Sequence, residues 1–178
     1  AAAAQKFIDK SVKADKPFFV WLNTTGMHFR THPAKKHLGK SGQDYYNDVM
    51  VAHDELVGLM LDQLDELGIA ENTIVFYSTD NGVHYNTWPD AGITPFRSEK
   101  NSNWEGAYRV PAVVRWPAKI APGQVSNEIM SHLDWMPTLV AAAGDSGLKE
   151  DLLKGKRVGS KNSKLHLDGY NFLPYLSG

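Results

Sequence analysis

The stretch Asn72-Thr-Ile-Val-Phe-Tyr-Ser-Thr-Asp-Asn-Gly82 decides the fold class of this chain. Its β-branched and aromatic run ends in polar residues, which is typical of a buried strand that leads into a loop. The preceding segment, 44–67, places apolar residues at helical spacing, and Gly68 stands where a helix C-terminal cap belongs. A helical pattern at 5–14 and an apolar run at 18–22 come earlier in the same order. This alternation predicts an α/β fold with helices on both faces of a sheet, and 18–22 as a second buried strand.

The rest of the chain continues the pattern less regularly. A third apolar stretch spans 110–116, and a helix is expected over 131–143. Between them and the central strand, 82–103 has no clear periodicity, and a loop of that length is usually functional or disordered. The segment 147–166 is polar and basic, so we expect it to form a surface excursion.

Composition limits the possible functions. The chain has 178 residues, of which 42% are hydrophobic, so it is long enough for one domain with a core. Its 19 basic and 20 acidic residues are mixed along the chain, which does not indicate nucleic-acid binding. Without cysteine it forms no disulfide, thiolate metal site or cysteine nucleophile. No apolar run approaches the roughly 20 residues of a membrane helix, and no signal peptide is visible.

The strand ends supply the residues suited to chemistry. In open α/β sheets, ligands bind beyond the carboxyl ends of the strands. There this sequence places Asp80 and Asn81 after one strand and a loop with His28 after the other. Carboxylate and amide oxygens suit Ca²⁺ or Mg²⁺ better than Zn²⁺. Asp80-Asn81-Gly82 is equally the composition of a plain turn.

A longer ordered set of motifs resembles the second half of the type I sulfatase family. Asp80-Asn81-Gly82 is followed by Lys100, a gap of four residues, and Glu105-Gly-Ala-Tyr-Arg109-Val-Pro111. Four further segments are similar to the family in the correct order, at 22–28, 54–58, 131–144 and 167–174. The resemblance therefore covers nearly the whole chain.

This resemblance implies an alkaline-phosphatase-like α/β/α sandwich with a mostly parallel sheet, present over 1–178 as an incomplete half-domain. Sulfatases use a formylglycine made from Cys or Ser in a Cys/Ser-x-Pro/Ala-x-Arg motif, and an aspartate pair that binds calcium. Both features lie in the family's N-terminal half, and neither occurs in this sequence. We therefore expect the chain to act together with an N-terminal half of the same enzyme and to be inactive in isolation.

The resemblance also assigns roles to individual residues. Asp80 and Asn81 would complete the Ca²⁺ shell, with Mg²⁺ as the alternative ion. Lys100 would contact the sulfate oxygens, against the alternative of a solvated loop lysine. His28 would hydrogen-bond the sulfate or give a proton to the leaving alcohol.

Other polar residues compete for these roles. His32 competes with His28, which is preferred because it stands closer to the strand end. His84 follows the metal pair and would line the substrate pocket, although an ordinary loop histidine explains it equally well. Glu105 and Arg109 are interpreted as structural partners that hold the lysine segment.

The resemblance thus implies a sulfuric ester hydrolase that acts on a small-molecule or carbohydrate sulfate ester. A phosphate- or phosphonate-ester hydrolase of the same superfamily and a non-catalytic α/β binding module remain as alternatives. The family implies a periplasmic or secreted location, with a cytoplasmic one still open.

Overall fold

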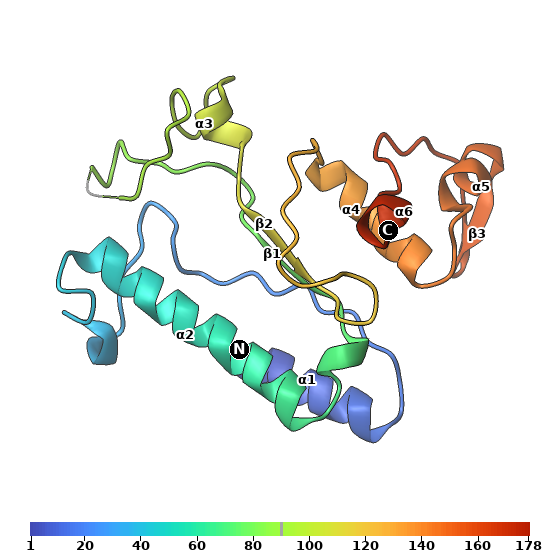
Figure 1. The fold of residues 1–178 in the computed structure, drawn as a ribbon, viewed down its shortest axis with the longest axis horizontal. Helices are drawn as coiled ribbons and strands as arrows, with labels where there is room; N and C mark the ends of the chain where they lie inside the picture. The colour runs from blue at the N-terminus through green and yellow to red at the C-terminus, as the bar shows by residue number, and fades with distance from the viewer. Residues whose placement is uncertain (90) are drawn as a thin grey trace. The chain divides into compact units, whose positions relative to one another are not determined.

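The computed structural model describes residues 1–89 and 91–178, which form two compact units, Ala1–Val114 and Arg115–Gly178. The chain contains both helices and short strands (Figure 1). Among the described residues, no helix combines the length and apolar character that crossing a membrane requires.

The first unit contains most of the predicted elements. In chain order they are α1 (Ala2–Lys13), η1 (Lys35–His37), α2 (Tyr45–Glu66), η2 (Ala70–Asn72), β1 (Val75–Ser78), α3 (Glu105–Tyr108) and β2 (Ala112–Arg115), the last of which ends at the unit boundary.

Helices α1 and α2 lie side by side (Figure 1). The Gln63 amide of α2 donates hydrogen bonds to the Gln5 carbonyl, at 2.9 Å, and to the Asp9 carboxylate of α1, at 2.8 Å. Ile8 of α1 and Leu64 of α2 are buried. Both helices were predicted from apolar periodicity, and both are confirmed.

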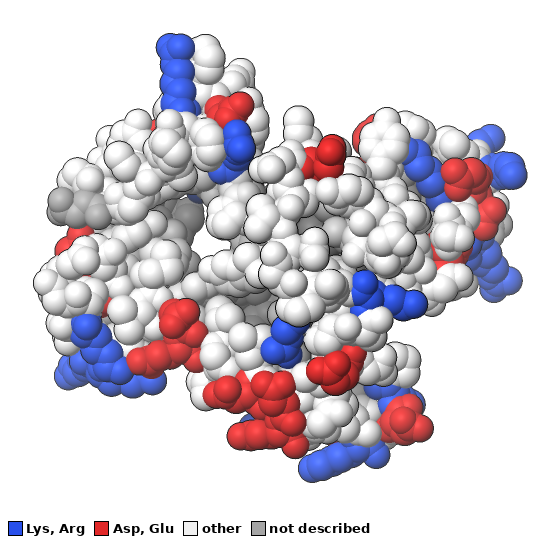
Figure 2. Space-filling view, in the orientation of Figure 1, with Lys and Arg blue, Asp and Glu red and all other residues white. Residues whose placement is uncertain are grey.

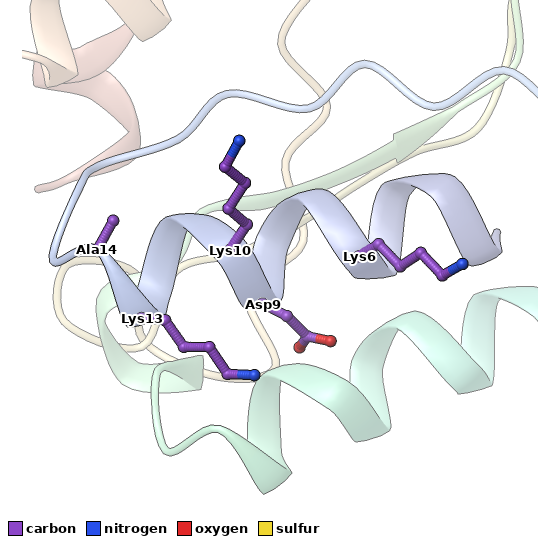
Figure 3. Close-up of a pocket in the computed structure, with 5 residues that line it drawn as sticks. All are labelled: Lys6, Asp9, Lys10, Lys13 and Ala14. Carbon is purple, nitrogen blue, oxygen red and sulfur yellow. The ribbon is translucent and has the colours of Figure 1, made fainter.

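A hollow of about 390 Å³ lies on the surface of α1 (Figure 3). It is lined by Lys6, Asp9, Lys10, Lys13 and Ala14. In Figure 3 the Asp9 carboxylate points toward α2 and the Lys10 side chain points away from it. The lining cations therefore do not converge on one point.

Strands β1 and β2 pair with each other. The Ser78 hydroxyl at the end of β1 donates to the Pro111 carbonyl just before β2, at 2.9 Å, so the strands run in opposite directions (Figure 1). Strand β1 was predicted, and β2 lies within the apolar stretch 110–116; both are shorter than the apolar runs that contain them.

The predicted strand over 18–22 is wrong. This segment is not paired with any strand in the described part of the chain. Phe19 is 69% exposed and Trp21 is 81% exposed, whereas burial on both faces was expected. A strand requires a neighbouring backbone to accept and donate its hydrogen bonds, and an apolar run without one remains an extended, solvated segment.

The second unit is built around one helix. Its elements are α4 (His132–Ala142), α5 (Leu148–Lys154), β3 (Lys156–Val158), β4 (Lys161–Ser163) and α6 (Leu173–Leu176). Ser131 and Asp134 form a capping box at the start of α4, the predicted helix. The Asp134 carboxylate also accepts a hydrogen bond from the Tyr170 backbone amide at 2.7 Å, which ties the C-terminal segment to α4.

The segment 147–166, expected as a surface excursion, has structure of its own. Helix α5 packs against α4, with Leu148 and Leu152 buried. Strands β3 and β4 form an antiparallel hairpin in which Arg157 pairs with Asn162. Most of the remaining side chains in this segment are exposed, as its polarity predicts.

The charged side chains are mixed in sign over the face drawn in Figure 2. This mixture agrees with the formal net charge of −1.

Candidate active site

The site begins where β1 ends. Asp80 and Asn81 follow this strand directly, with Asp80 exposed and Asn81 half-buried. The Thr79 hydroxyl donates to the Asn81 backbone carbonyl at 3.3 Å, which closes the turn. The turn residues at the strand end are therefore accessible to a ligand, as sequence reasoning expected.

Gly82 and Gly106 allow the segment that carries Lys100 to pack closely against this turn. The Gly82 amide donates to the Ala107 carbonyl at 2.6 Å, and the Lys100 amide donates to the Val83 carbonyl at 2.9 Å. A Cβ atom on Gly82 would lie 1.8 Å from the Gly106 carbonyl oxygen, so the two backbones touch. Only glycine permits this approach. Lys100 is thus placed beside the residues that follow Asp80 and Asn81, although they are distant in sequence.

Left-handed backbone conformations stand next to the two predicted catalytic residues. Ser98 (φ 66°) and Asn101 (φ 70°) flank Lys100, and Met27 (φ 65°) precedes His28. Such conformations are costly for residues other than glycine and concentrate at functional sites. They show that the backbone is constrained beside Lys100 and His28, which the sequence did not reveal.

The histidine loop reaches the same place through Phe29. The Phe29 ring contacts the His28 ring, with 4.6 Å between centroids, and the His84 ring, with 6.2 Å. Trp88 donates its indole N–H to the Phe29 carbonyl at 2.8 Å. The loop that carries His28 is therefore fixed against the segment that carries His84. Sequence reasoning missed Phe29, because nothing marks an aromatic residue in a loop as a connector.

The predicted histidines differ in their surroundings. His28 is exposed, whereas His84 is half-buried and its Nδ1 atom is buried with no hydrogen-bond partner among the described residues. His32 is exposed, and the structure gives it no link to His84. His28 contacts Phe29, but its preference over His32 rested on a strand at 18–22 that the structure does not form, so the choice between the two stays a prediction.

Lys100 has a free charge. Its side chain is half-buried, and within the described ranges its ammonium group forms no ion pair or side-chain hydrogen bond. A positive group held by its backbone and left unpaired is suited to contact an anion.

Glu105 and Arg109 have the structural role that was predicted for them. Their side chains form an ion pair at 3.0 Å across one turn of α3. The Arg109 guanidinium also lies over the Phe96 ring, 4.2 Å from its centroid. Arg97 lies over the Trp104 ring at 3.7 Å. These stacked pairs connect α3 to the residues just before Lys100.

His53 of α2 connects the helix to the segment after 18–22 and to β1. Its imidazole is within hydrogen-bond distance of the Thr24 hydroxyl, at 3.3 Å, and of the Tyr77 hydroxyl, at 3.1 Å. His53 thus has hydrogen-bond partners within the first unit.

The predicted metal ligands fit a hard cation as part of a larger set. Asp80 offers carboxylate oxygens and Asn81 an amide oxygen, which are the donor types that Ca²⁺ and Mg²⁺ prefer. In the ranges 1–89 and 91–178, no cluster of three or more acidic or histidine side chains is placed to hold a metal ion. A cation would therefore need further ligands beyond these two residues.

The candidate site of this α/β protein lies at the end of β1, where backbone contacts hold the segment of Lys100 against the residues after Asp80 and Asn81, and α/β folds bind their ligands at such strand ends. The model of the sulfatase family matches residues 1–145, and the chain belongs to this family.

Curated relatives agree with this assignment. The chain is 34% identical to steryl-sulfatase of Mus musculus over 169 residues, which cover 92% of the chain and 25% of that protein. It is 35% identical to N-acetylgalactosamine-6-sulfatase of Mus musculus over 143 residues, which cover 79% of the chain and 28% of that protein. The chain thus spans about a quarter of the length of these relatives.

Solved structures confirm the fold class. A crystal structure of the PsFucS1 sulfatase from Pseudoalteromonas sp. matches with a TM-score of 0.86 and 30% identity, over 99% of this chain and 33% of that one. A second, Ps i-CgsB in complex with k-i-k-neocarrahexaose, matches with a TM-score of 0.77 and 26% identity, over 97% of this chain and 36% of that one. The α/β fold predicted from sequence is therefore that of sulfatases, of which this chain matches a part.

Proposed function

We propose that this chain forms part of the active site of an enzyme that hydrolyses a sulfate ester. The observation that carries the proposal is the backbone contact that places Lys100 beside the Asp80-Asn81 turn. The sulfatase family and the named sulfatases among the relatives support the same reaction.

Lys100 would contact the sulfate oxygens. Its ammonium has no ionic partner among the described residues, so binding an anion there breaks no existing ion pair. As the ester bond breaks, negative charge builds on the bridging oxygen, and a fixed positive charge stabilises it.

His28 would act on the leaving alcohol. It is exposed, and its ring packs against Phe29, which also contacts His84. A histidine in such a position donates a proton to the departing alkoxide at Nδ1 or Nε2 and then recovers it from solvent. His84 would line the substrate pocket from the other side of Phe29.

Two groups would complete the site. Asp80 and Asn81 would hold Ca²⁺, with Mg²⁺ as the alternative, and the ion would supply positive charge that offsets the charge of the sulfate. A formylglycine in an N-terminal half of the same enzyme would supply the nucleophile. The isolated chain is accordingly proposed to be inactive.

We propose a carbohydrate or other small-molecule sulfate ester as the substrate and a periplasmic or secreted location. N-acetylgalactosamine-6-sulfatase is named for a sulfated sugar, and Ps i-CgsB was solved with a bound oligosaccharide. The loop between the Asp80-Asn81 turn and Lys100 would decide which ester is bound.

Substitution of Lys100 tests the proposal in the whole protein. Lys100→Ala should lower kcat/KM for a sulfate ester by roughly 10²–10³-fold, the usual cost of one electrostatic donor. It should change the free energy of unfolding by only about 0.5 kcal/mol, because little apolar surface is lost. Lys100→Arg should rescue poorly, since a planar guanidinium does not replace a compact ammonium.

Lys119→Ala serves as the matched control, because Lys119 is an exposed lysine in the second unit. It should leave both kinetics and stability unchanged. If Lys100→Ala keeps near-normal kcat/KM while Arg109→Ala abolishes activity, the anion contact belongs to Arg109. Faster turnover of a phosphate ester than of the matching sulfate ester would reassign the reaction.

A further inference from the structure

A second cavity is lined by residues that are close in sequence to the candidate site. It has a volume of about 400 Å³, within the range of small-molecule binding pockets. Its lining residues are Tyr85, Pro89, Ile93, Thr94, Phe96 and Ser98. Tyr85 directly follows His84, and Ser98 lies two residues before Lys100. Residues that line the cavity are therefore close in sequence to His84 and Lys100, the two proposed substrate contacts.

The lining combines ring-stacking surfaces with hydroxyl groups. Tyr85 and Phe96 supply aromatic rings, and Ile93, which is 69% exposed, supplies an aliphatic side chain. Thr94 and Ser98 supply hydroxyl groups that both donate and accept hydrogen bonds. A pyranose ring needs this combination, because its C–H face packs on aromatic rings while its hydroxyls seek hydrogen bonds.

The rims of the cavity are held in place by the same contacts that hold the lysine. Ser98 has a left-handed backbone (φ 66°), and a Cβ on Gly106 would lie 1.9 Å from the Ser98 carbonyl oxygen. Arg109 stacks on the Phe96 ring at 4.2 Å. The cavity and Lys100 are thus positioned by one set of close contacts, which suits a ligand that engages both.

We propose that this cavity binds the sugar ring of the substrate and makes the enzyme selective for sulfated pyranosides. The proposal rests on the function proposed above for Lys100 and His28. Tyr85 and Ile93 are the residues that would recognise the ring, and neither takes part in the reaction itself.

The test compares two esters in the whole protein. Methyl galactopyranoside 6-sulfate and ethyl sulfate are both sulfates of a primary alcohol, so their leaving groups match and only the ring differs. Tyr85→Ala should lower kcat/KM for the sugar sulfate by roughly fivefold to tenfold, the scale of one lost stacking contact. It should leave ethyl sulfate within about twofold, because the sulfate contacts remain.

Two further variants guard against a folding artefact. Ile93→Ala removes an exposed side chain. It should also lower kcat/KM for the sugar sulfate more than for ethyl sulfate, but by a smaller factor than Tyr85→Ala. Tyr45→Ala and Ile129→Ala alter a tyrosine and an isoleucine that are also exposed but do not line the cavity. These controls should leave both esters unchanged. Equal losses on the two esters, or no loss on either, would overturn the sugar assignment while the sulfatase function stands.

Binding provides a readout that does not depend on turnover. Ligand-observed NMR with methyl galactopyranoside, which carries no sulfate, should show saturation transfer from this chain to the ring protons. The transfer should disappear in Tyr85→Ala and persist in Tyr45→Ala. Absence of transfer from the unsubstituted chain would overturn the proposal. If the whole protein hydrolyses neither ester but this transfer is present, the sulfatase function fails and the sugar pocket stands.

Discussion

Replacing Gly82 by alanine should disrupt the contact on which the candidate site depends. The new Cβ would lie 1.8 Å from the Gly106 carbonyl oxygen and 3.0 Å from the Ala107 Cα. Both neighbours are backbone atoms, so no side-chain rotation relieves the overlap. The turn after β1 must separate from the segment that carries Lys100.

The magnitude follows from two losses. Overpacking of a close contact costs about 1–3 kcal/mol. Separation also lengthens the hydrogen bond from the Gly82 amide to the Ala107 carbonyl, 2.6 Å in the structure, at a cost of about 1 kcal/mol. A total of about 2–4 kcal/mol lowers the melting temperature by roughly 5–15 °C in a chain of this size.

Gly58→Ala provides the matched control. Gly58 lies within α2, and a Cβ there would have no atom within 4 Å. Alanine in an open helical position should stabilise the chain by about 0.5–1 kcal/mol, because glycine loses more backbone entropy on folding. The same substitution should therefore have opposite signs at the two positions.

Thermal unfolding followed by circular dichroism measures both variants. The reasoning is refuted if Gly82→Ala melts within about one degree of the unsubstituted chain. It is also refuted if Gly58→Ala loses as much stability as Gly82→Ala, since the loss would then reflect alanine itself and not the backbone contact.

Two other predictions concern stability in each unit. Asp134→Ala should lower the free energy of unfolding by about 2 kcal/mol, because the buried carboxylate caps α4 at Ser131 and also accepts a hydrogen bond from the Tyr170 amide at 2.7 Å. Urea unfolding measures this loss. A loss no larger than that of Asp168→Ala, at an exposed position, would contradict the prediction. The Lys40 ammonium and then the His37 imidazole, both hydrogen-bonded to Glu55, lower the pKa of that carboxyl from 4.5 to about 2. Because the folded pKa is the lower one, this stabilisation is complete above about pH 5 and is lost as the pH falls from 4.5 toward 2. The melting temperature of Glu55→Gln should therefore depend less on pH in that window, and identical acid profiles for the two proteins would contradict the assignment.

The local elements could be predicted from sequence because their signals are local. Apolar residues at helical spacing gave α1, α2 and α4, and the capping residues Asp44 and Ser131 mark where two of these helices begin. The run before Asp80 gave β1. The spacing of Lys100 from Glu105 pointed to the family, since order and spacing of motifs are properties of the chain alone.

Tertiary structure decided what depends on partners far away in the sequence. The apolar run 18–22 predicts a buried strand. A strand needs a second strand to pair with, and no strand among the described residues pairs with this run. Leu148 and Leu152 lie in a polar segment, and only their packing against α4 buries them.

The arrangement of the candidate site belongs to the same category. Sequence analysis named Asp80, Asn81, His28, His84 and Lys100 but contained no measure of the distances between them. The glycine contact at Gly82 and the Phe29 ring bring their segments together. Such contacts join residues tens of positions apart, and their geometry depends on the whole packed unit, whereas a helix period or a strand end depends only on neighbouring residues.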